Sequence, residues 1–204
     1  MTRAYDMRKR NRASEATRAR IIDAAHRLLN RPGGGSLTLA EVAGEAQVTR
    51  ATIYNRVGVR RDLLKAVFED QGVRIEFHRV LHAMEASSPE EAVCDTVRES
   101  CRAWSVMPGA IRRTLALATV DSEIRGLTRS YEAARRQRVA KLVDRLVTSG
   151  ILPGTIDPEY AVATLVLLTG FPAYDQLAAH LDPAALENHL VRMATQGLGL
   201  PQGR

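Results

Sequence analysis

The sequence predicts an all-α protein. Apolar residues recur at the three- and four-residue spacing of a helix along most of the 204 residues, and glycine and proline fall between these segments. No stretch alternates apolar and polar residues as a half-buried strand would. An apolar fraction of 45% and a charged fraction of 25% are typical of a globular protein. The length suffices for one large domain or two small ones with a sizeable core.

The chain opens with a basic segment that lacks apolar periodicity. Residues 1–13 contain five cations, and we expect them to form a flexible arm: Arg3, Arg8, Lys9, Arg10 and Arg12. A first helix is expected from Ser14 to Asn30, with its buried stripe formed by Ile21, Ile22, Ala25, Leu28 and Leu29. The run from Arg31 to Gly35 contains one proline and three glycines, which end that helix.

A two-helix unit follows from Thr38 onward. Thr38 and Glu41 have the spacing of a capping box, which predicts a helix start. Gln47 and Val48 form a turn, and Thr49 can cap a second helix that runs to about Arg56. Apolar residues give the first of these helices one inward stripe: Leu39, Val42, Ala43 and Ala46.

The second helix of this unit has two different faces. Ile53 and Val57 are four residues apart and point inward. The remaining positions are small, polar or cationic: Arg50, Ala51, Thr52, Asn55 and Arg56. Two short helices with a polar and basic second member predict the helix-turn-helix geometry.

The segment from about Ala16 to Phe68 resembles the DNA-binding domain of TetR-type transcriptional regulators. The resemblance rests on I-I-D-A-A at Ile21–Ala25, on T-L-A-E-V-A-G from Thr38, and on T-R-A-T-I-Y followed by R-R-D-L-L. The sequence departs from the family pattern at Gln47, Val57 and Arg60, where Gly, Phe and Lys are usual. The resemblance implies a helix-turn-helix DNA-binding domain at residues 14–62 and a helical effector-binding and dimerisation domain at residues 63–204.

The charge distribution favours the same partner. Residues 1–61 contain 13 Lys or Arg and 5 Asp or Glu, whereas residues 62–204 contain 16 and 18. The whole positive excess therefore lies with the two-helix unit, and charge alone would also fit a solvated basic surface. Charge together with the motif indicates double-stranded DNA, which the N-terminal arm would help to bind through phosphates or a minor groove.

Roles at DNA follow from side-chain chemistry. Arg suits guanine, Asn suits adenine and the Thr methyl suits thymine, so the expected base contacts are Arg50, Thr52 and Asn55. The expected phosphate contacts are hydroxyl and cationic side chains near the helix starts: Thr38, Thr49, Tyr54, Arg56, Arg60 and Arg61.

The rest of the chain predicts further helices. They are expected at residues 61–84, 88–107, 110–119, 121–150, 158–180 and 182–197. The helix at 158–180 is apolar nearly all round between Ala161 and Tyr174, so it must be covered on more than one side. The TetR resemblance implies a homodimer through the last two helices and a palindromic operator, although burial within one subunit would also account for these residues.

The resemblance also implies a pocket for an unidentified small-molecule effector among the central helices. Its candidate lining residues are Trp104, Met107, Tyr131, Phe171 and Tyr174, with Arg98, Cys101 and Arg135 as polar anchors. Each could equally be ordinary core or surface. We expect an effector to change the angle between two DNA-reading helices and release DNA from a repressor. An effector-independent repressor is the alternative.

An enzyme is not expected. The sequence has no glycine-rich loop after a strand, no G-x-S-x-G and no zinc-type cysteine spacing. An all-α enzyme therefore stays a remote alternative, and no cofactor is expected. His78 and His82, with Glu85, have a spacing that metals use, but a polar helix face is the simpler interpretation, and no metal site is expected. Cys94 and Cys101 suit two small buried residues better than a disulfide.

A cytoplasmic, bacterial protein without a membrane segment is expected. The first twelve residues are charged, and no apolar core of a signal peptide follows them. The longest apolar run, Ala161–Ala173, is too short to span a bilayer and contains a glycine and a proline.

Overall fold

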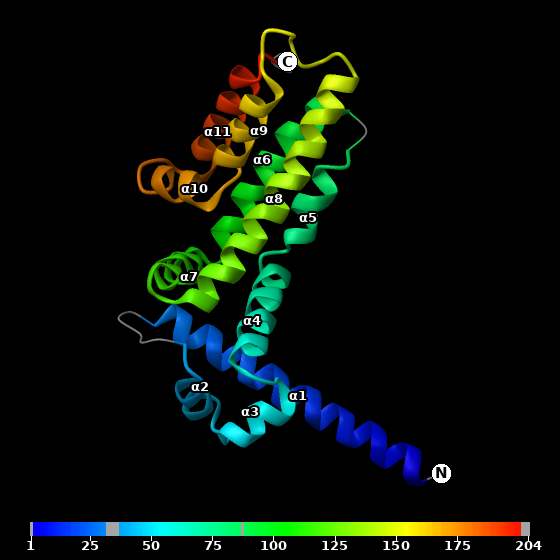
Figure 1. The fold of residues 1–204 in the computed structure, drawn as a ribbon, viewed down its shortest axis with the longest axis vertical. Helices are drawn as coiled ribbons and strands as arrows, with labels where there is room; N and C mark the ends of the chain where they lie inside the picture. Colours follow the sequence, from blue (N-terminus) through cyan, green and yellow to red (C-terminus); the bar gives the residue numbers. More distant parts are fainter. Residues whose placement is uncertain (1, 32–36, 87, 201–204) are drawn as a thin grey trace. The chain divides into compact units, whose positions relative to one another are not determined.

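The computed structural model describes residues 2–31, 37–86 and 88–200, with side chains from Arg12 onward. Within these ranges the chain is helical and contains no strand (Figure 1). The helices are α1 (Thr2–Asn30), α2 (Leu39–Ala46), α3 (Arg50–Arg56), α4 (Arg60–Arg74), α5 (Phe77–Ala83), α6 (Pro89–Val106), α7 (Pro108–Val120), α8 (Ser122–Thr148), α9 (Pro158–Leu168), α10 (Phe171–Leu177) and α11 (Pro183–Gly197). The all-α prediction is confirmed.

Two compact units divide the chain. Unit 1 comprises Met1–Gln71 and Arg112–Leu127, and unit 2 comprises Gly72–Ile111 and Thr128–Arg204. The sequence predicts a boundary after residue 62 and no return of the chain to the first part. The chain comes back to unit 1 because the end of α7 and the start of α8 pack there. Local sequence patterns do not predict such long-range packing.

The core of unit 1 joins α1, α2 and α3 to the start of α4. α1 runs diagonally past the short helices α2 and α3 (Figure 1). The apolar stripes predicted for these helices meet here, and the largest fully buried side chains of the unit are Ile21, Val42, Ile53, Leu63, Leu64 and, from α8, Ile124. Burying such a side chain stabilises the fold by about 1.5–3 kcal/mol, so this small core fixes the orientation of α3.

Local hydrogen bonds set the limits of α2. Glu41 N donates to Thr38 Oγ1 at 3.2 Å, and Thr38 N donates to a Glu41 carboxylate oxygen at 2.9 Å. This is the predicted capping box. Gln47 ends the helix in the left-handed region, with φ of 53° and ψ of 49°. Thr49 then caps α3 by accepting a hydrogen bond from Thr52 N at 3.1 Å.

A glycine makes the turn from α3 to α4. Gly58 has φ of +112°, and a Cβ there would lie 2.3 Å from Asp62 Oδ2. The same Asp62 oxygen accepts a hydrogen bond from Val59 N at 3.0 Å. Because a side chain at residue 58 would suffer both backbone strain and this clash, only glycine lets α4 begin at Arg60.

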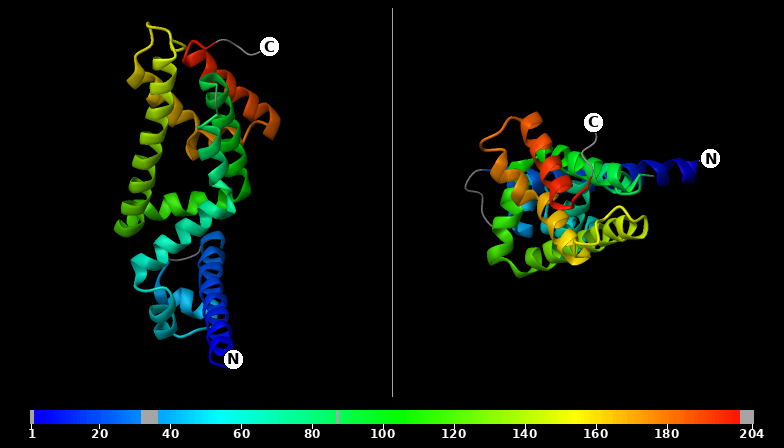
Figure 2. Two further views of the ribbon diagram at one scale, coloured as in Figure 1. Left: turned by 90° about the vertical axis from the view of Figure 1, so that its right-hand side faces the viewer. Right: turned by 90° about the horizontal axis from the view of Figure 1, so that it is seen from above.

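Unit 2 is built around α6, α8, α9 and α11. α9 and α11 lie side by side in Figures 1 and 2, and the side chains that fill the space between these helices and α6 and α8 are apolar. The innermost include Val93, Val97, Leu142, Leu146, Leu165 and Leu190. A Cβ on Gly197 would lie 3.3 Å from Thr164 Cγ2, so α11 approaches α9 closely at its end.

The N-terminal helix is longer than the sequence predicts. An arm was expected up to residue 13, but α1 begins at Thr2. Residues 2–13 contain no glycine or proline and are rich in Arg, Lys and Ala, which are strong helix formers. The side chains of Arg3, Arg8, Lys9 and Arg10 lie outside the described residues, as do Pro32–Gly35 of the predicted helix-ending run.

The single helix predicted for residues 61–84 is wrong, because α4 and α5 are separate. Glu76 adopts a left-handed conformation with φ of 52°, and its N–H bonds Val73 O at 3.0 Å. The Glu76 carboxylate lies 3.0 Å from Arg102 Nη1 on α6. No glycine or proline marks this break, and a tertiary ion pair accompanies it.

The single helix predicted for residues 158–180 is also wrong. Gly170 caps a new helix, α10, with Pro172 in its first turn. A Cβ on Gly170 would lie 3.2 Å from Leu167 O and Val166 O, so glycine permits a tight corner. Proline lacks the N–H that would continue α9. None of the described helices is both long enough and apolar enough to cross a bilayer.

Gln47 is a non-glycine residue in a conformation that costs roughly 1–2 kcal/mol for most side chains. We predict that Gln47→Gly raises the free energy of unfolding by about 0.5–1 kcal/mol, because glycine relieves that strain but loses more entropy on folding. Urea denaturation measures the change. Gln47→Ala, which keeps the strain, should lie within about 0.5 kcal/mol of wild type. Destabilisation by Gln47→Gly would contradict this account.

Candidate nucleic-acid interface

The outer face of α3 carries the side chains predicted to contact bases. Arg50, Asn55 and Arg56 are exposed, and Tyr54 is 52% exposed. Ile53 is fully buried on the opposite side and anchors the helix. Thr52 is partly buried, and its hydroxyl lies 2.9 Å from Thr49 Oγ1. The structure thus brings Arg50, Thr52 and Asn55 together on one short helix, with the Thr52 hydroxyl already engaged.

Two of the predicted phosphate contacts use their hydroxyls within the fold. Thr38 Oγ1 accepts from Glu41 N and donates to a Glu41 carboxylate oxygen at 2.8 Å. Thr49 Oγ1 accepts from Thr52 N. Each hydroxyl caps the start of its helix. The primary role of both threonines is therefore to hold the backbone at the start of α2 and α3.

The cations of unit 1 fall into two groups. Arg27 and Arg31 each bond Glu45, at 2.7 Å in both cases, and the hydrogen bond from Arg27 is the main reason that the pKa of Glu45 lies below its usual value. Arg50 and Arg61 are exposed and have no carboxylate partner among the described residues. The described cations of unit 1 that remain for an anion therefore include Arg50 and Arg61, at the two ends of the α3–α4 segment, and Arg12, Arg18 and Arg20 on α1.

Arg56 is held in place by α1. Its Nη1 donates to Ser14 Oγ at 2.9 Å. The bond joins the last residue of α3 to the long first helix and leaves the other guanidinium N–H groups for a phosphate. This link spans 42 residues, so no local sequence pattern predicts it.

Comparison with known proteins agrees with this geometry. Residues 21–67 match the family described as bacterial regulatory proteins, tetR family. The match begins with the buried stripe of α1 and ends in α4, so it covers the whole helix-turn-helix. Residues 21–67 therefore form a helix-turn-helix segment of the TetR type. The match makes the exposed face of α3 the candidate surface for DNA.

One curated relative extends the match beyond this domain. The HTH-type transcriptional regulator BetI of Rhizobium meliloti is 30% identical over 129 residues, which are 62% of this chain and 63% of that protein. The matched segment is thus less than two thirds of the relative's length.

Solved TetR-family structures share the fold along nearly the whole chain. A TetR transcription regulator from Haloarcula marismortui has a TM-score of 0.69 at 18% identity, covering 92% of this chain and 100% of that one. A TetR-like regulator from Rhodococcus sp. RHA1 has a TM-score of 0.66 at 16% identity, covering 90% and 96%. At such identities the likeness concerns the fold.

Arg60 has partners that the sequence does not predict. Its guanidinium bonds the carboxylates of Asp121, at 2.5 Å, and Glu123, and its Nε donates to Leu37 O at 3.1 Å. The Arg60 and Asp121 side chains are only 24% and 18% exposed. Arg60 was expected to bind phosphate; here it joins the start of α4 to the start of α8, within unit 1.

Asp121 has two roles in this cluster. Its Oδ1 accepts hydrogen bonds from Glu123 N and Ile124 N, at 3.0 and 3.1 Å, and so caps α8. Burial is the largest single influence on the pKa of Asp121 and raises it, but the hydrogen bond and charge of Arg60, together with the N–H groups of Ile124 and Glu123, outweigh burial and leave the pKa below its ordinary value of 3.8. The carboxylate is therefore stabilised as an anion.

Four of the predicted pocket residues in unit 2 gather at the α9–α10 corner. Trp104 Nε1 donates to Thr169 O at 3.0 Å, and Arg135 Nη1 donates to Val166 O at 2.8 Å. The Phe171 ring lies 5.8 Å from the Trp104 ring and 6.3 Å from that of Tyr174. Arg135 is 9% exposed and satisfies Val166 O near the end of α9. These contacts give this cluster a structural role.

The other four predicted pocket residues do not line a common pocket with the cluster at the α9–α10 corner. Arg98 pairs with Asp95 at 2.9 Å, and Tyr131 is 44% exposed. Met107 ends α6. Cys101 is buried, which raises the pKa of its thiol to about 12, and both Cys94 and Cys101 are free.

The role of the Asp121 charge can be tested by Asp121→Asn. Asparagine keeps the cap on α8 but loses the ion pair, so we predict a loss of about 1–2 kcal/mol in the free energy of unfolding at pH 7. A depressed carboxylate pKa stabilises the fold above the unfolded pKa near 4 and ceases to do so as the pH falls through the folded pKa. Urea denaturation from pH 7 to pH 3 should therefore show the variant and wild type converging.

A constant difference across that pH range would contradict the charge explanation. Ser122→Ala, a change on an exposed neighbouring residue that keeps both carboxylates, serves as the control and should leave the pH dependence unchanged.

Proposed function

We propose that the protein represses transcription as a homodimer that binds a palindromic operator and is released by a small-molecule effector. The observation that carries the DNA part is the exposed face of α3, where Arg50 and Asn55 project from a helix anchored by buried Ile53. A bound dimer would cover operator DNA and so exclude competing proteins from it.

Arg50 and Asn55 suit direct base contact. Arg presents a planar fork that matches the O6 and N7 acceptors of guanine, and Asn can bond the N6 and N7 atoms of adenine. Both side chains are exposed and without an ion-pair partner among the described residues. Thr52 contributes its methyl group, because its hydroxyl already lies 2.9 Å from that of Thr49.

Phosphate contacts fall to Arg61, Arg56 and Tyr54. Arg61 is exposed at the start of α4, and Arg56 is oriented by Ser14. The start of α3 can add the backbone N–H group of Thr49. Arg60 becomes a positioning residue in this proposal, because its guanidinium already bonds Asp121 and Glu123.

An exposed apolar stripe supports dimerisation through the last two helices. Tyr160 and Leu167, seven residues apart on α9, are 59% and 63% exposed, and exposed Ala163 lies between them. Met193 on α11 is 42% exposed. Residues at this spacing share one helix face, and a second copy of the chain would bury them as a four-helix bundle. Two-fold pairing would then match a palindrome, with one α3 in each half-site.

Base and phosphate contacts should respond differently to substitution. We predict that Arg50→Ala weakens binding to the preferred duplex by about 1–3 kcal/mol and relaxes preference at one base pair. Arg61→Ala should weaken all duplexes alike and reduce the slope of log affinity against log salt by about 0.9 for each phosphate that it no longer neutralises. Selection from random duplexes, followed by fluorescence anisotropy at several salt concentrations, measures both.

The opposite pattern, with Arg61→Ala changing the selected sequence, would show that the assignment of these two arginines is wrong. Arg129→Ala removes an exposed charge outside unit 1 and is the control, with wild-type sequence preference expected.

The dimer can be tested with Leu167→Glu. A charge on the apolar stripe should yield a monomer and weaken operator binding by about tenfold or more, since the two half-sites are then bound separately. Sedimentation equilibrium and anisotropy give the two results. Val147→Glu, at a 44% exposed position of α8, is the matched control. A dimeric Leu167→Glu protein would rule out this interface.

A further inference from the structure

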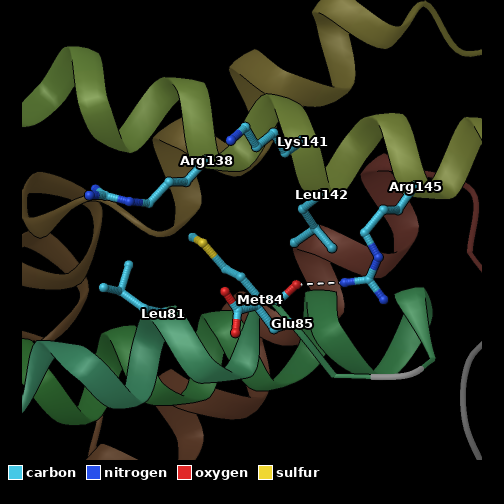
Figure 3. A pocket seen from close by; sticks show the side chains of 7 residues that line it. All are labelled: Leu81, Met84, Glu85, Arg138, Lys141, Leu142 and Arg145. Carbon is cyan, nitrogen blue, oxygen red and sulfur yellow. Dashed lines mark hydrogen bonds between the residues drawn. The ribbon is translucent and has the colours of Figure 1, made fainter.

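A cavity of about 350 Å³ lies between α5 and α8 in unit 2 (Figure 3). From the end of α5 and the turn after it come Leu81, Met84 and Glu85. α8 contributes Arg138, Lys141, Leu142 and Arg145. Figure 3 shows Met84 and Leu142 reaching toward each other from the two helices, with the charged side chains around them. The floor of this groove is apolar and its rim is mainly cationic.

Two of the rim cations have no ion pair within the part of the chain that the structure describes. Arg138 and Lys141 are exposed and three residues apart, so they lie on the same side of α8. Leu142 and Met84 behind them are only 2% and 7% exposed. The groove thus sets available positive charge beside a closely packed apolar surface.

Arg145 holds the closed end of the groove. Its Nη1 donates to Met84 O at 2.6 Å, and its Nη2 donates to Ala86 O. These bonds satisfy carbonyls at the end of α5 and tie that end to α8. The spacing of the two walls is therefore fixed before any ligand enters, which lowers the entropic cost of binding.

We infer that this groove is the effector site and that its ligand is a small amphiphile with one anionic head group and an apolar chain. The inference rests on the proposed function for its regulatory consequence. A carboxylate can take two parallel hydrogen bonds from the Arg138 fork and one from Lys141. The chain would displace water from the partly exposed Leu81 and lie against the buried side chains of Met84 and Leu142.

Size and charge restrict the ligand. At roughly 30 Å³ for each water-sized group, the cavity holds about a dozen non-hydrogen atoms. That matches a carboxylic acid of about ten carbons and excludes a folded partner segment. Glu85 on the rim repels a second anionic group and would attract a cation, so it selects against highly charged anions.

α8 offers a path from this groove to the DNA-binding unit. It is one continuous helix from Ser122 to Thr148. Its first turn is capped by Asp121, which bonds Arg60 at the start of α4, and its later turns carry Arg138 and Lys141. A ligand that shifts α8 would thereby change the constraint on α4 and, through it, on α3. This gives the effector a physical element on which to act.

The test uses the full chain and three probes of equal chain length: decanoate, 1-decanol and decyltrimethylammonium. Calorimetry without DNA measures binding, and anisotropy with a duplex selected from a random library measures release. Decanoate should bind at least about tenfold more tightly than the other two, because only it makes charge-assisted hydrogen bonds to the rim. Equal binding of 1-decanol would overturn the role of the cations.

Three variants locate the site. Arg138→Gln should weaken decanoate about tenfold, whereas Arg129→Gln, which removes an exposed charge elsewhere on α8, should leave it unchanged. Glu85→Gln should tighten decanoate about threefold, a gain that misfolding cannot produce. Equal losses in Arg138→Gln and Arg129→Gln, or no gain in Glu85→Gln, would place the ligand elsewhere.

Regulation is judged separately. Release of the selected duplex by decanoate, abolished in Arg138→Gln, supports the groove as the effector site. Decanoate binding without any change in DNA affinity overturns that assignment, while failure to select any duplex rejects the proposed function itself and leaves the calorimetric result standing. A protein that binds its duplex but binds none of the three probes overturns the inference alone.

Discussion

The guanidinium of Arg60 joins parts of unit 1 that are far apart in sequence. It bonds Asp121 and Glu123, 61 and 63 residues away, and Leu37 O just before α2. The α3–α4 turn brings Arg60 into this position because Gly58 allows α4 to begin shortly after α3 ends. One partly shielded ion-pair cluster thus constrains the segments on both sides of the helix-turn-helix. Its charges interact more strongly there than on an open surface, because less water screens them.

The elements that the sequence predicts well are those fixed by neighbours three or four residues away. Thr38 with Glu41, Thr49, and Ser88 before Pro89 all cap the expected helices, because a cap needs only a local backbone N–H. The two helix breaks that escaped prediction depend on distant partners. Glu76 pairs with Arg102 on α6, and the corner at Gly170 is completed by the distant side chains Arg135 and Trp104, which bond the end of α9.

The candidate sites divide in the same way. The exposed face of α3 follows from the period of one short helix with Ile53 buried behind it, so the sequence sufficed to find it. The groove between α5 and α8 forms only where two helices meet, so a local pattern does not predict it. The scarce aromatic residues instead led to a predicted pocket around Trp104 and Phe171. Trp104 and Phe171 pack edge to face at the α9–α10 corner, where large apolar rings stabilise a core. The spacing of Arg138, Lys141 and Arg145 on α8 was the local signal for the groove.

Net charge over a long segment conceals where charge is available. Arg27 and Arg31 both bond Glu45, and Arg60 bonds Asp121 and Glu123, so several of the cations counted in residues 1–61 are already engaged within the fold. Conversely, residues 62–204 carry a slight negative balance, yet Arg138 and Lys141 stand together without a carboxylate partner among the described residues. An anion responds to the cations that lack such partners, because the field of a paired cation is largely cancelled by its neighbour. The surfaces that can bind DNA or a small anion therefore depend on which cations have carboxylate partners in the folded chain. Composition alone does not identify these cations.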